Sequence, residues 1–217
     1  MKNKIVLSRD LIFAQYSDFL LNHGERPKNV YLFAKENKFE EKEFYHFFSG
    51  FDQIEKEMFN YFFVKSVEIV ITETPESTNS AKEKLLNVYF VFFENLTMNR
   101  SIVLNMLGQN KLQHLKTVET LRISFFNFIS TLDFKEWEVV KNSNENIQKI
   151  NEKSRQGALW LHLLSVIEFW RSDQSPDFEN TDVFIEKTID TGFEFLDSEP
   201  LRKVIDLGKF LWKQNFK

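Results

Sequence analysis

Apolar residues recur every three or four positions along nearly all of this 217-residue chain, and few residues interrupt the spacing. Gly occurs 6 times and Pro 4 times, so breakers are too scarce to separate many short strands. Apolar residues at this spacing lie on one face of a helix. The sequence therefore predicts an all-α fold, in a chain long enough for one large domain or for a small domain joined to a larger one.

Charge and cysteine content exclude several functional classes. The 28 Lys and Arg are balanced by 32 Asp and Glu, so any binding to nucleic acid or to an acidic membrane must use a local surface. The chain has no Cys, which excludes disulfides, thiolate metal sites and a cysteine nucleophile. Polar residues interrupt the apolar residues near the start, so we expect no signal peptide, no stable membrane insertion and a soluble, cytoplasmic protein.

The spacing near the start predicts two short helices around a tight turn. In the first part of the chain we expect helices over residues 9–22, 29–37, 40–47 and 52–71. Gly24 is expected to end the first helix, Asn37 and Lys38 to form the turn, and Asp52 to cap the fourth helix. The fourth helix has an apolar face of Ile54, Met58, Phe62 and Ile69 that continues without a breaker, so we expect a rigid connecting helix.

The rest of the chain also has helical spacing. We expect helices over residues 81–99, 100–107, 112–133, 157–170, 182–196 and 200–216. Residues 72–80 are expected to form a loop, and residues 141–155 either a loop or a weakly held, solvent-facing helix. Thr181 or Asp182 is expected to cap the helix that follows it.

The apolar positions of the first third follow a known pattern. From Arg9 to about residue 60, the sequence resembles the DNA-binding domain of TetR-type transcriptional regulators. The matching positions are Gly24, Val30, Phe33, Ala34, Phe39, Phe44, Tyr45, Phe47 and Phe48, followed by residues 49–52. The resemblance implies a helix-turn-helix domain in residues 1–50 and a helical ligand-binding and dimerisation domain in residues 51–217. It implies a homodimer that binds double-stranded DNA through Arg9, Lys28, Lys38, Glu41, Lys42, Glu43, Tyr45 and His46.

The departures from this pattern fall on the surface that reads DNA. The family usually has Ser, Lys, Gly and Thr where this chain has Glu40, Glu41, Lys42 and Glu43. Phe51 replaces a Lys that commonly binds phosphate. Residues 1–65 hold ten Lys and Arg and ten Asp and Glu, so this segment is neutral. Like charges about 4 Å apart cost around 1 kcal/mol in water, so carboxylates next to phosphates oppose binding. The cost is avoided if the carboxylates accept hydrogen bonds from cytosine amino groups. Alternatively, these carboxylates only stabilise a helix N-terminus.

Phe is unusually frequent, with 25 copies against 5 Tyr and 4 Trp. In the second domain, aromatic and aliphatic residues recur on successive helices where the family surrounds a small-molecule pocket. The residues expected to bind an apolar ligand, such as a lipid or isoprenoid, are Tyr89, Phe92, Phe93, Leu96, Met106, Leu121, Phe125 and Phe126. An ordinary bundle core is the alternative, because aromatic residues at helical spacing usually just pack.

Two late segments, residues 157–170 and 182–196, are apolar on more than one face. A helix apolar nearly all round needs cover on both sides. In the family, two late helices from each subunit form the dimer interface. The residues expected there are Trp160, Leu163, Leu164, Ile167, Phe184, Ile185, Ile189 and Phe193.

The sequence contains no recognisable catalytic pattern. His23, His46, His114 and His162 stand singly, without a second ligand at metal-binding spacing. Gly-rich phosphate loops and nucleophile elbows are absent. We expect no enzyme activity, no metal and no cofactor.

Two functions remain open from the sequence. The first is a TetR-type regulator, a DNA-binding homodimer that responds to an apolar ligand. The second is a protein of the same fold that has lost DNA binding and binds a lipid, an isoprenoid or a protein partner, similar to the lipid-binding accessory proteins of ubiquinone biosynthesis.

Overall fold

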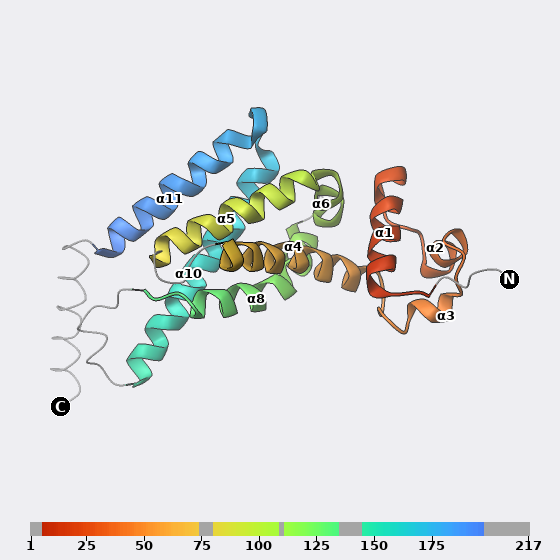
Figure 1. Cartoon of the computed structure of the whole chain (residues 1–217), viewed down its shortest axis with the longest axis horizontal. Helices are drawn as coiled ribbons and strands as arrows, with labels where there is room; N and C mark the ends of the chain where they lie inside the picture. The colour runs from red at the N-terminus through yellow and green to blue at the C-terminus, as the bar shows by residue number, and fades with distance from the viewer. Residues whose placement is uncertain (1–5, 74–79, 109–110, 135–144, 198–217) are drawn as a thin grey trace. The chain divides into compact units, whose positions relative to one another are not determined.

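The computed structural model describes residues 6–73, 80–108, 111–134 and 145–197 (Figure 1). Regular structure within these ranges is helical, which confirms the predicted all-α fold. The helices are α1 (Arg9–His23), α2 (Val30–Glu36), α3 (Glu41–Phe44), α4 (Phe51–Glu73), α5 (Ala81–Met98), α6 (Arg100–Leu107), α7 (Lys111–Thr117), α8 (Glu119–Ser130), α10 (Glu145–Ser172), the 3-10 helix η1 (Pro176–Phe178) and α11 (Glu179–Asp197). The predicted last helix, residues 200–216, lies outside the described residues.

The chain divides into two compact units. Unit 1 contains the chain up to Glu68 together with Phe92–Phe125. Unit 2 contains Ile69–Val91 and the chain from Phe126 onwards. Unit 1 therefore holds α1, α2 and α3 with the first part of α4, and unit 2 holds α10 and α11. A functional boundary near residue 50 stays a prediction.

The first two helices start and end as their capping residues dictate. Ser8 Oγ accepts a hydrogen bond from the backbone N–H of Leu11 at 3.1 Å, and Asn29 Oδ1 accepts from that of Leu32 at 2.9 Å. Gly24 ends α1 in the left-handed conformation, with φ of 70°, as predicted. The helices bury the apolar faces that the spacing identified, including Ile12, Tyr16 and Leu20 of α1.

The start of α4 differs from the prediction. The helix begins at Phe51, and Asp52 lies within its first turn rather than at its cap. Gln53 Oε1 instead accepts from the backbone N–H of Ser49 at 2.7 Å, and Asp52 pairs with Arg26. Ile54 and Met58 are buried as predicted, but Ile69 is exposed. The apolar face therefore does not continue at one angle along the whole helix.

The predicted helix over residues 112–133 is two helices, α7 and α8. They meet at Val118, beside a buried Thr117 whose hydroxyl donates to the carbonyl oxygen of Met106 at 3.2 Å. A buried hydroxyl needs a partner, and two β-branched residues in sequence lower helix propensity. The spacing of apolar residues carries no information about this break.

Residues 145–155 belong to a single long helix, α10, which continues through Gly157 to Ser172. The helical alternative for this segment is confirmed, while the boundary expected at Gly157 is wrong. Side-chain pairs four residues apart support the polar first half: Lys149 pairs with Glu145 at 2.6 Å, and Gln156 donates to Glu152 at 3.3 Å.

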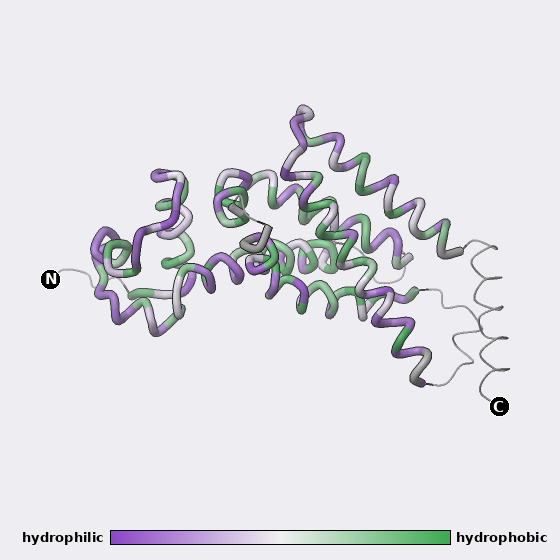
Figure 2. Tube along the Cα trace, turned by 180° about the vertical axis from the view of Figure 1, so that it is seen from behind, coloured by the Kyte–Doolittle hydropathy of each residue, from purple (hydrophilic) through white to green (hydrophobic). Residues whose placement is uncertain are grey.

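The N-terminus of α11 is held by Asp173 rather than by Thr181 or Asp182. Asp173 Oδ2 accepts from the backbone N–H of Thr181 at 2.9 Å and from its hydroxyl at 2.7 Å. Asp173 Oδ1 accepts from the backbone N–H and the hydroxyl of Ser175, at 2.9 and 2.7 Å. The helix therefore begins at Glu179, and Asp182 lies in its first turn. Polar and apolar residues alternate along α11, as a helix with one packed face requires (Figure 2).

Candidate nucleic-acid interface

Phe33 lies at the centre of the small core formed by α1, α2, α3 and the start of α4. It is fully buried, and five rings surround it with centroids 5.6 to 6.2 Å away, all in edge-on contact. These rings belong to Tyr16, Phe19, Phe39, Phe44 and Phe51. Aromatic side chains from four helices and from the turn thus place α2 and α3 in the helix-turn-helix arrangement that the sequence predicted.

Phe51, which departs from the family pattern, is one of these core residues. Its ring stacks on that of Tyr16 with centroids 5.3 Å apart and contacts those of Phe33 and Phe44 edge-on. Its identity therefore follows from packing.

The turn between α2 and α3 contains a residue in the left-handed conformation, which Gly adopts most readily. Lys38 has a φ of 63°. The backbone N–H of Phe39 donates to the carbonyl oxygen of Ala34 at 3.0 Å, and that of Lys38 to Lys35 at 3.3 Å. This pair of hydrogen bonds is the Schellman ending of a helix, which requires the left-handed residue. Lys38 therefore adopts a strained backbone, and its side chain is exposed.

The carboxylates of α3 are engaged by their own helix. Glu43 Oε2 accepts from the backbone N–H of Glu40 at 3.0 Å, as in a capping box. Glu41 accepts from the Tyr45 hydroxyl at 3.2 Å, and Glu40 pairs with Lys42 at 2.7 Å. The hydrogen bond and charge of Glu40 raise the pKa of Lys42 above its ordinary value. The acidic residues therefore have a structural role at the start of α3.

The residues expected to contact DNA are not all equally available. Arg9 donates to the carbonyl oxygen of Phe47 at 3.2 Å, pairs with Glu57 and lies over the Phe48 ring at 4.6 Å. It therefore joins α1 to α4 and to the end of the helix-turn-helix. Lys28, Lys38, Tyr45 and His46 have exposed side chains.

The outer face of α2 carries residues that the sequence reading passed over. Tyr31 and Leu32 are 54% and 44% exposed, and Lys35 is exposed too. Lys28 precedes the Asn29 cap of α2, and Lys38 follows the helix in the turn, so these two exposed lysines flank α2. We call these five residues the α2 stripe: Lys28, Tyr31, Leu32, Lys35 and Lys38. In the described part of the chain, no hydrogen bond or ion pair involves the side chain of any of its lysines.

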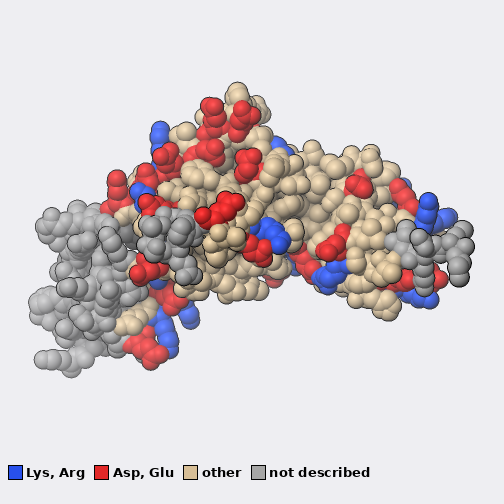
Figure 3. Space-filling model, in the orientation of Figure 1, with Lys and Arg blue, Asp and Glu red and all other residues tan. Residues whose placement is uncertain are grey.

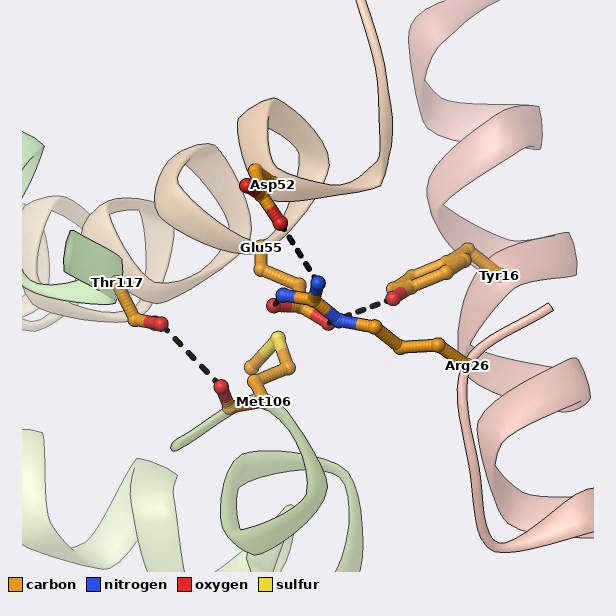
Figure 4. Close-up of polar contacts among 6 residues, drawn as sticks. All are labelled: Tyr16, Arg26, Asp52, Glu55, Met106 and Thr117. Carbon is orange, nitrogen blue, oxygen red and sulfur yellow. Dashed lines mark hydrogen bonds and ion pairs between the residues drawn. The ribbon is translucent and has the colours of Figure 1, made fainter. Parts of the chain in front are cut away.

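A buried ionic cluster lies beneath this domain. Glu55 of α4 is 1% exposed, and its Oε1 accepts from the Tyr16 hydroxyl and from Arg26 Nε, both at 2.6 Å (Figure 4). Burial raises the pKa of Glu55, and the hydrogen bonds from Arg26 and Tyr16 oppose that rise. Burial and the neighbouring Glu55 charge raise the pKa of Tyr16 far above its ordinary value, so its hydroxyl remains a donor.

The residues expected to bind a ligand are largely packed. In unit 1, six of them are buried: Phe92, Phe93, Leu96, Met106, Leu121 and Phe125. The ring of Phe92 contacts those of Phe59, Phe63 and Phe93, with centroids 5.4 to 6.1 Å apart. In unit 2, Tyr89 is buried and Phe126 lies edge-on to Trp160 at 6.4 Å. A ligand pocket among them stays a prediction.

Unit 2 contains a polar chain between α5, α10 and α11. His162 Nε2 lies 2.8 Å from Thr188 Oγ1, and Nδ1 lies 3.3 Å from the Tyr89 hydroxyl. The Thr188 hydroxyl donates to the carbonyl oxygen of Phe184 at 2.6 Å, so Nε2 is the ring nitrogen that carries the proton. Burial lowers the pKa of His162 and raises that of Tyr89. The neutral imidazole therefore joins three helices.

The chain itself buries most of the residues expected at a dimer interface. Five are buried, namely Trp160, Leu163, Ile167, Ile185 and Ile189, and Leu164, Phe184 and Phe193 are half-buried. Phe184 stacks on Phe169 with centroids 4.4 Å apart. Large apolar side chains that α10 and α11 expose are others: Leu161 is 67% exposed, Ile150 64%, Phe195 60% and Val183 43%.

No cluster of three or more His, Cys, Asp or Glu that could hold a metal occurs among the described residues. Nor is any described helix both long and apolar enough to cross a membrane.

The C-terminal part of the chain has a recognisable sequence family. Residues 84–211 match the sequence model of the tetracyclin repressor-like, C-terminal domain. A search of curated proteins gives no match. The matched residues cover more than half of the chain and lie outside the segment on which the resemblance was first recognised, so the two observations are independent. The all-helical fold, the N-terminal helix-turn-helix and the matched C-terminal domain agree: the chain belongs to the tetracyclin repressor-like family of regulators.

Proposed function

We propose that this regulator binds double-stranded DNA, and that the α2 stripe supplies the phosphate contacts. The observation that supports this proposal is the exposure of Lys28, Lys35 and Lys38, which lie before, on and directly after α2, with no acidic partner in the described part of the chain. Tyr31 adds a residue that is 54% exposed. Affinity for duplex DNA comes largely from neutralised phosphates, so three available lysines outweigh the formal neutrality of the segment.

The contribution of α3 is sequence reading rather than charge. Its helix spans only Glu41–Phe44, and its carboxylates accept hydrogen bonds within the helix-turn-helix itself. Tyr45 and His46 are exposed directly after it. These two side chains are the ones we propose for contact with base edges.

The test is a fluorescence-anisotropy titration of the full-length protein with DNA from upstream of its own gene and with an unrelated duplex, between about 50 and 200 mM salt. Replacing Lys28 and Lys35 by Ala should lower the slope of log affinity against log salt by about two for both duplexes. The matched control replaces Lys116 and Lys149, two exposed lysines outside the helix-turn-helix, and should leave the slope unchanged. A wild-type protein without salt-sensitive binding to either duplex rejects the proposal.

We infer that the regulator acts as a homodimer through α10 and α11. Leu161, Val183 and Phe195 support this inference, because large apolar side chains exposed on neighbouring helices are the surface that a second copy can cover. Replacing Leu161 and Phe195 by Glu should convert the dimer to a monomer in sedimentation equilibrium. The matched control, Ile150→Glu, changes an equally exposed residue in the polar first half of α10.

An apolar ligand for the second domain is the remaining part of the proposal. The frequency of Phe and the family membership support it. Native mass spectrometry of the purified protein, followed by lipid extraction, is the direct test. A retained apolar compound supports a ligand. Detection of the protein mass alone, with no compound in the extract, counts against a ligand.

A regulator-shaped protein that binds a lipid and no DNA is the second candidate. The observation in its favour is the ion pair between Glu40 and Lys42. It neutralises the Lys42 side chain and leaves Glu41 and Glu43 as the net charge of α3. Retained lipid together with no salt-sensitive DNA binding would select this candidate.

A further inference from the structure

Glu55 joins three segments of unit 1 through one carboxylate. Tyr16 reaches it from α1, Arg26 from the connection between α1 and α2, and Glu55 itself stands on the second turn of α4. Figure 4 shows the Met106 side chain of α6, which is also buried, pointing toward this cluster. The carboxylate is therefore closed off from water by packed side chains.

Arg26 uses its whole guanidinium group in this cluster. Nε donates to Glu55 Oε1 at 2.6 Å, Nη2 pairs with Glu55 Oε2, and Nη1 pairs with Asp52 at 2.6 Å. A two-pronged pair between a planar guanidinium and a carboxylate fixes the relative angle of the groups as well as their distance. The Asp52 contact is largely exposed, so the directional constraint comes from Glu55.

Stability alone does not account for such a group. Replacing a buried ion pair by apolar residues of similar volume is often neutral or stabilising, although removing one partner is strongly destabilising. The aromatic core around Phe33 already supplies apolar packing, and the Tyr16–Phe51 stack is part of it. What the ionic cluster adds is orientation.

Orientation matters at this place because Arg26 leads directly into α2. The buried Pro27 follows it, and Asn29 then caps α2. The direction of the α2 stripe relative to α4 therefore depends on how Arg26 is held. The two half-sites of an operator lie at a fixed separation. If the helix-turn-helix rotates relative to α4, the two protomers of a dimer can no longer contact both half-sites at once.

We propose that Glu55 is the positioning residue of the DNA-binding surface, holding α1 and α2 at one orientation on α4. This inference rests on the proposed DNA-binding function. Glu55 raises the affinity for specific DNA because it orients the helix-turn-helix before DNA binds. It leaves the electrostatic contacts between lysines and phosphates unchanged.

The test replaces the cluster by apolar residues in the full-length protein: Tyr16→Phe, Arg26→Met and Glu55→Leu together. This combination leaves no buried partner unsatisfied, and the exposed Asp52 carboxylate is solvated, so we expect an unfolding temperature within about 5 °C of the wild type. The ratio of specific to non-specific DNA affinity should fall by about tenfold or more, while the salt slope of non-specific binding stays the same.

A second measurement needs no DNA. The chain has no Cys, so Asn22→Cys on α1 and Lys116→Cys on α7 give one pair of spin labels per protomer within unit 1, and dilution with unlabelled protein removes distances between protomers. The distance distribution should be narrow in the wild-type background and broad in the triple variant. Asp52→Asn is the matched control, which removes the exposed partner only and should change the affinity ratio less than about twofold.

An equally narrow label distribution in the triple variant overturns the inference, and so does a broad distribution with an unchanged affinity ratio. Failure of the proposed function is recognised separately, because the wild-type protein then binds no duplex while the label distances still report orientation. Loss of folding in the triple variant, seen as a collapse of the unfolding temperature, also overturns the inference, since the cluster would then be required for folding itself.

Discussion

The ring of Phe51 stacks on the ring of Tyr16, with centroids 5.3 Å apart and planes inclined by 14°. The position that holds a phosphate-binding Lys in related regulators is thus a structural contact between α4 and α1 in this chain. The residue at this position is set by the packing of an aromatic core. The absence of Lys there is therefore weak evidence against DNA binding.

We therefore expect that restoring the family residue, Phe51→Lys, fails to raise DNA affinity. It should lower the free energy of unfolding by about 2 to 3 kcal/mol, since a half-buried ring with three ring contacts is lost. Urea denaturation measures this change. Ile123→Lys, at an exposed apolar residue, is the control and should cost less than about 0.5 kcal/mol.

A substitution at Lys38 should increase the stability of the protein. Its φ of 63° costs a residue with a Cβ atom roughly 1 kcal/mol, and Gly adopts this conformation freely. Lys38→Gly should stabilise the protein by about 0.5 kcal/mol after the larger entropy of the unfolded Gly chain is included. Lys38→Ala removes the same charge but keeps the Cβ atom, so equal stabilities of the two variants would contradict the explanation.

The stability of unit 2 should depend on the protonation of His162. Burial lowers its pKa in the folded protein, so the unfolded chain binds this proton more readily. The contribution of neutral His162 to the free energy of unfolding is constant above the unfolded pKa of about 6.5. It is lost as the pH falls from there toward the folded pKa. Urea unfolding at pH 7.5 and 5.5 should therefore show a larger loss for the wild type than for His162→Gln. Parallel losses in the two proteins would argue against a role for this imidazole.

Asp173 should be important for the start of α11, because its two oxygens accept four hydrogen bonds from Ser175 and Thr181. Asp173→Ala should cost about 1 to 2 kcal/mol. Burial raises the pKa of Asp173, but these hydrogen bonds outweigh it and the net pKa is lowered. The stabilisation is therefore present above the unfolded pKa of about 3.9 and is lost as the pH falls through the folded value. Glu186→Ala, at an exposed carboxylate of α11, is the control for thermal unfolding.

The acidic face of α3 should weaken DNA binding without preventing it. Glu40→Gln releases Lys42 from its ion pair and removes one negative charge near the proposed interface. We expect an increase of about fivefold in affinity for duplex DNA at low salt, corresponding to roughly 1 kcal/mol. Glu145→Gln, which neutralises an exposed carboxylate of α10, should leave affinity unchanged, and equal effects of both variants would indicate a general charge effect.

Periodicity was sufficient for the helix-turn-helix, because Val30, Phe33, Ala34 and Phe44 are buried by local packing that the spacing records directly. Helix boundaries set by single polar contacts could not be read from it. The Asp173 cap acts from outside the helix that it starts, and the Thr117 break depends on a carbonyl oxygen eleven residues earlier. Neither leaves a pattern in the sequence.

The candidate site was predicted in part for the same reason. Lys28, Lys38, Tyr45 and His46 are exposed as a DNA-contacting surface requires, but Arg9 is used within the fold, and Tyr31 and Lys35 were passed over. A signal for Tyr31 and Lys35 was present, since they lie four residues apart and therefore share one face of α2. The Arg26–Glu55 pair joins residues 29 positions apart, which no local pattern can reveal.

The sequence of α11 contains six acidic residues and one basic residue, Lys187, and Figure 3 shows acidic side chains gathered over this helix. If α11 lies between two copies, their like charges repel, and added salt relieves that repulsion while it weakens contacts to phosphate. Assembly and DNA binding then respond to ionic strength in opposite directions. In the proposed dimer, occupancy of an operator should therefore fall less steeply with added salt than the phosphate contacts alone would predict.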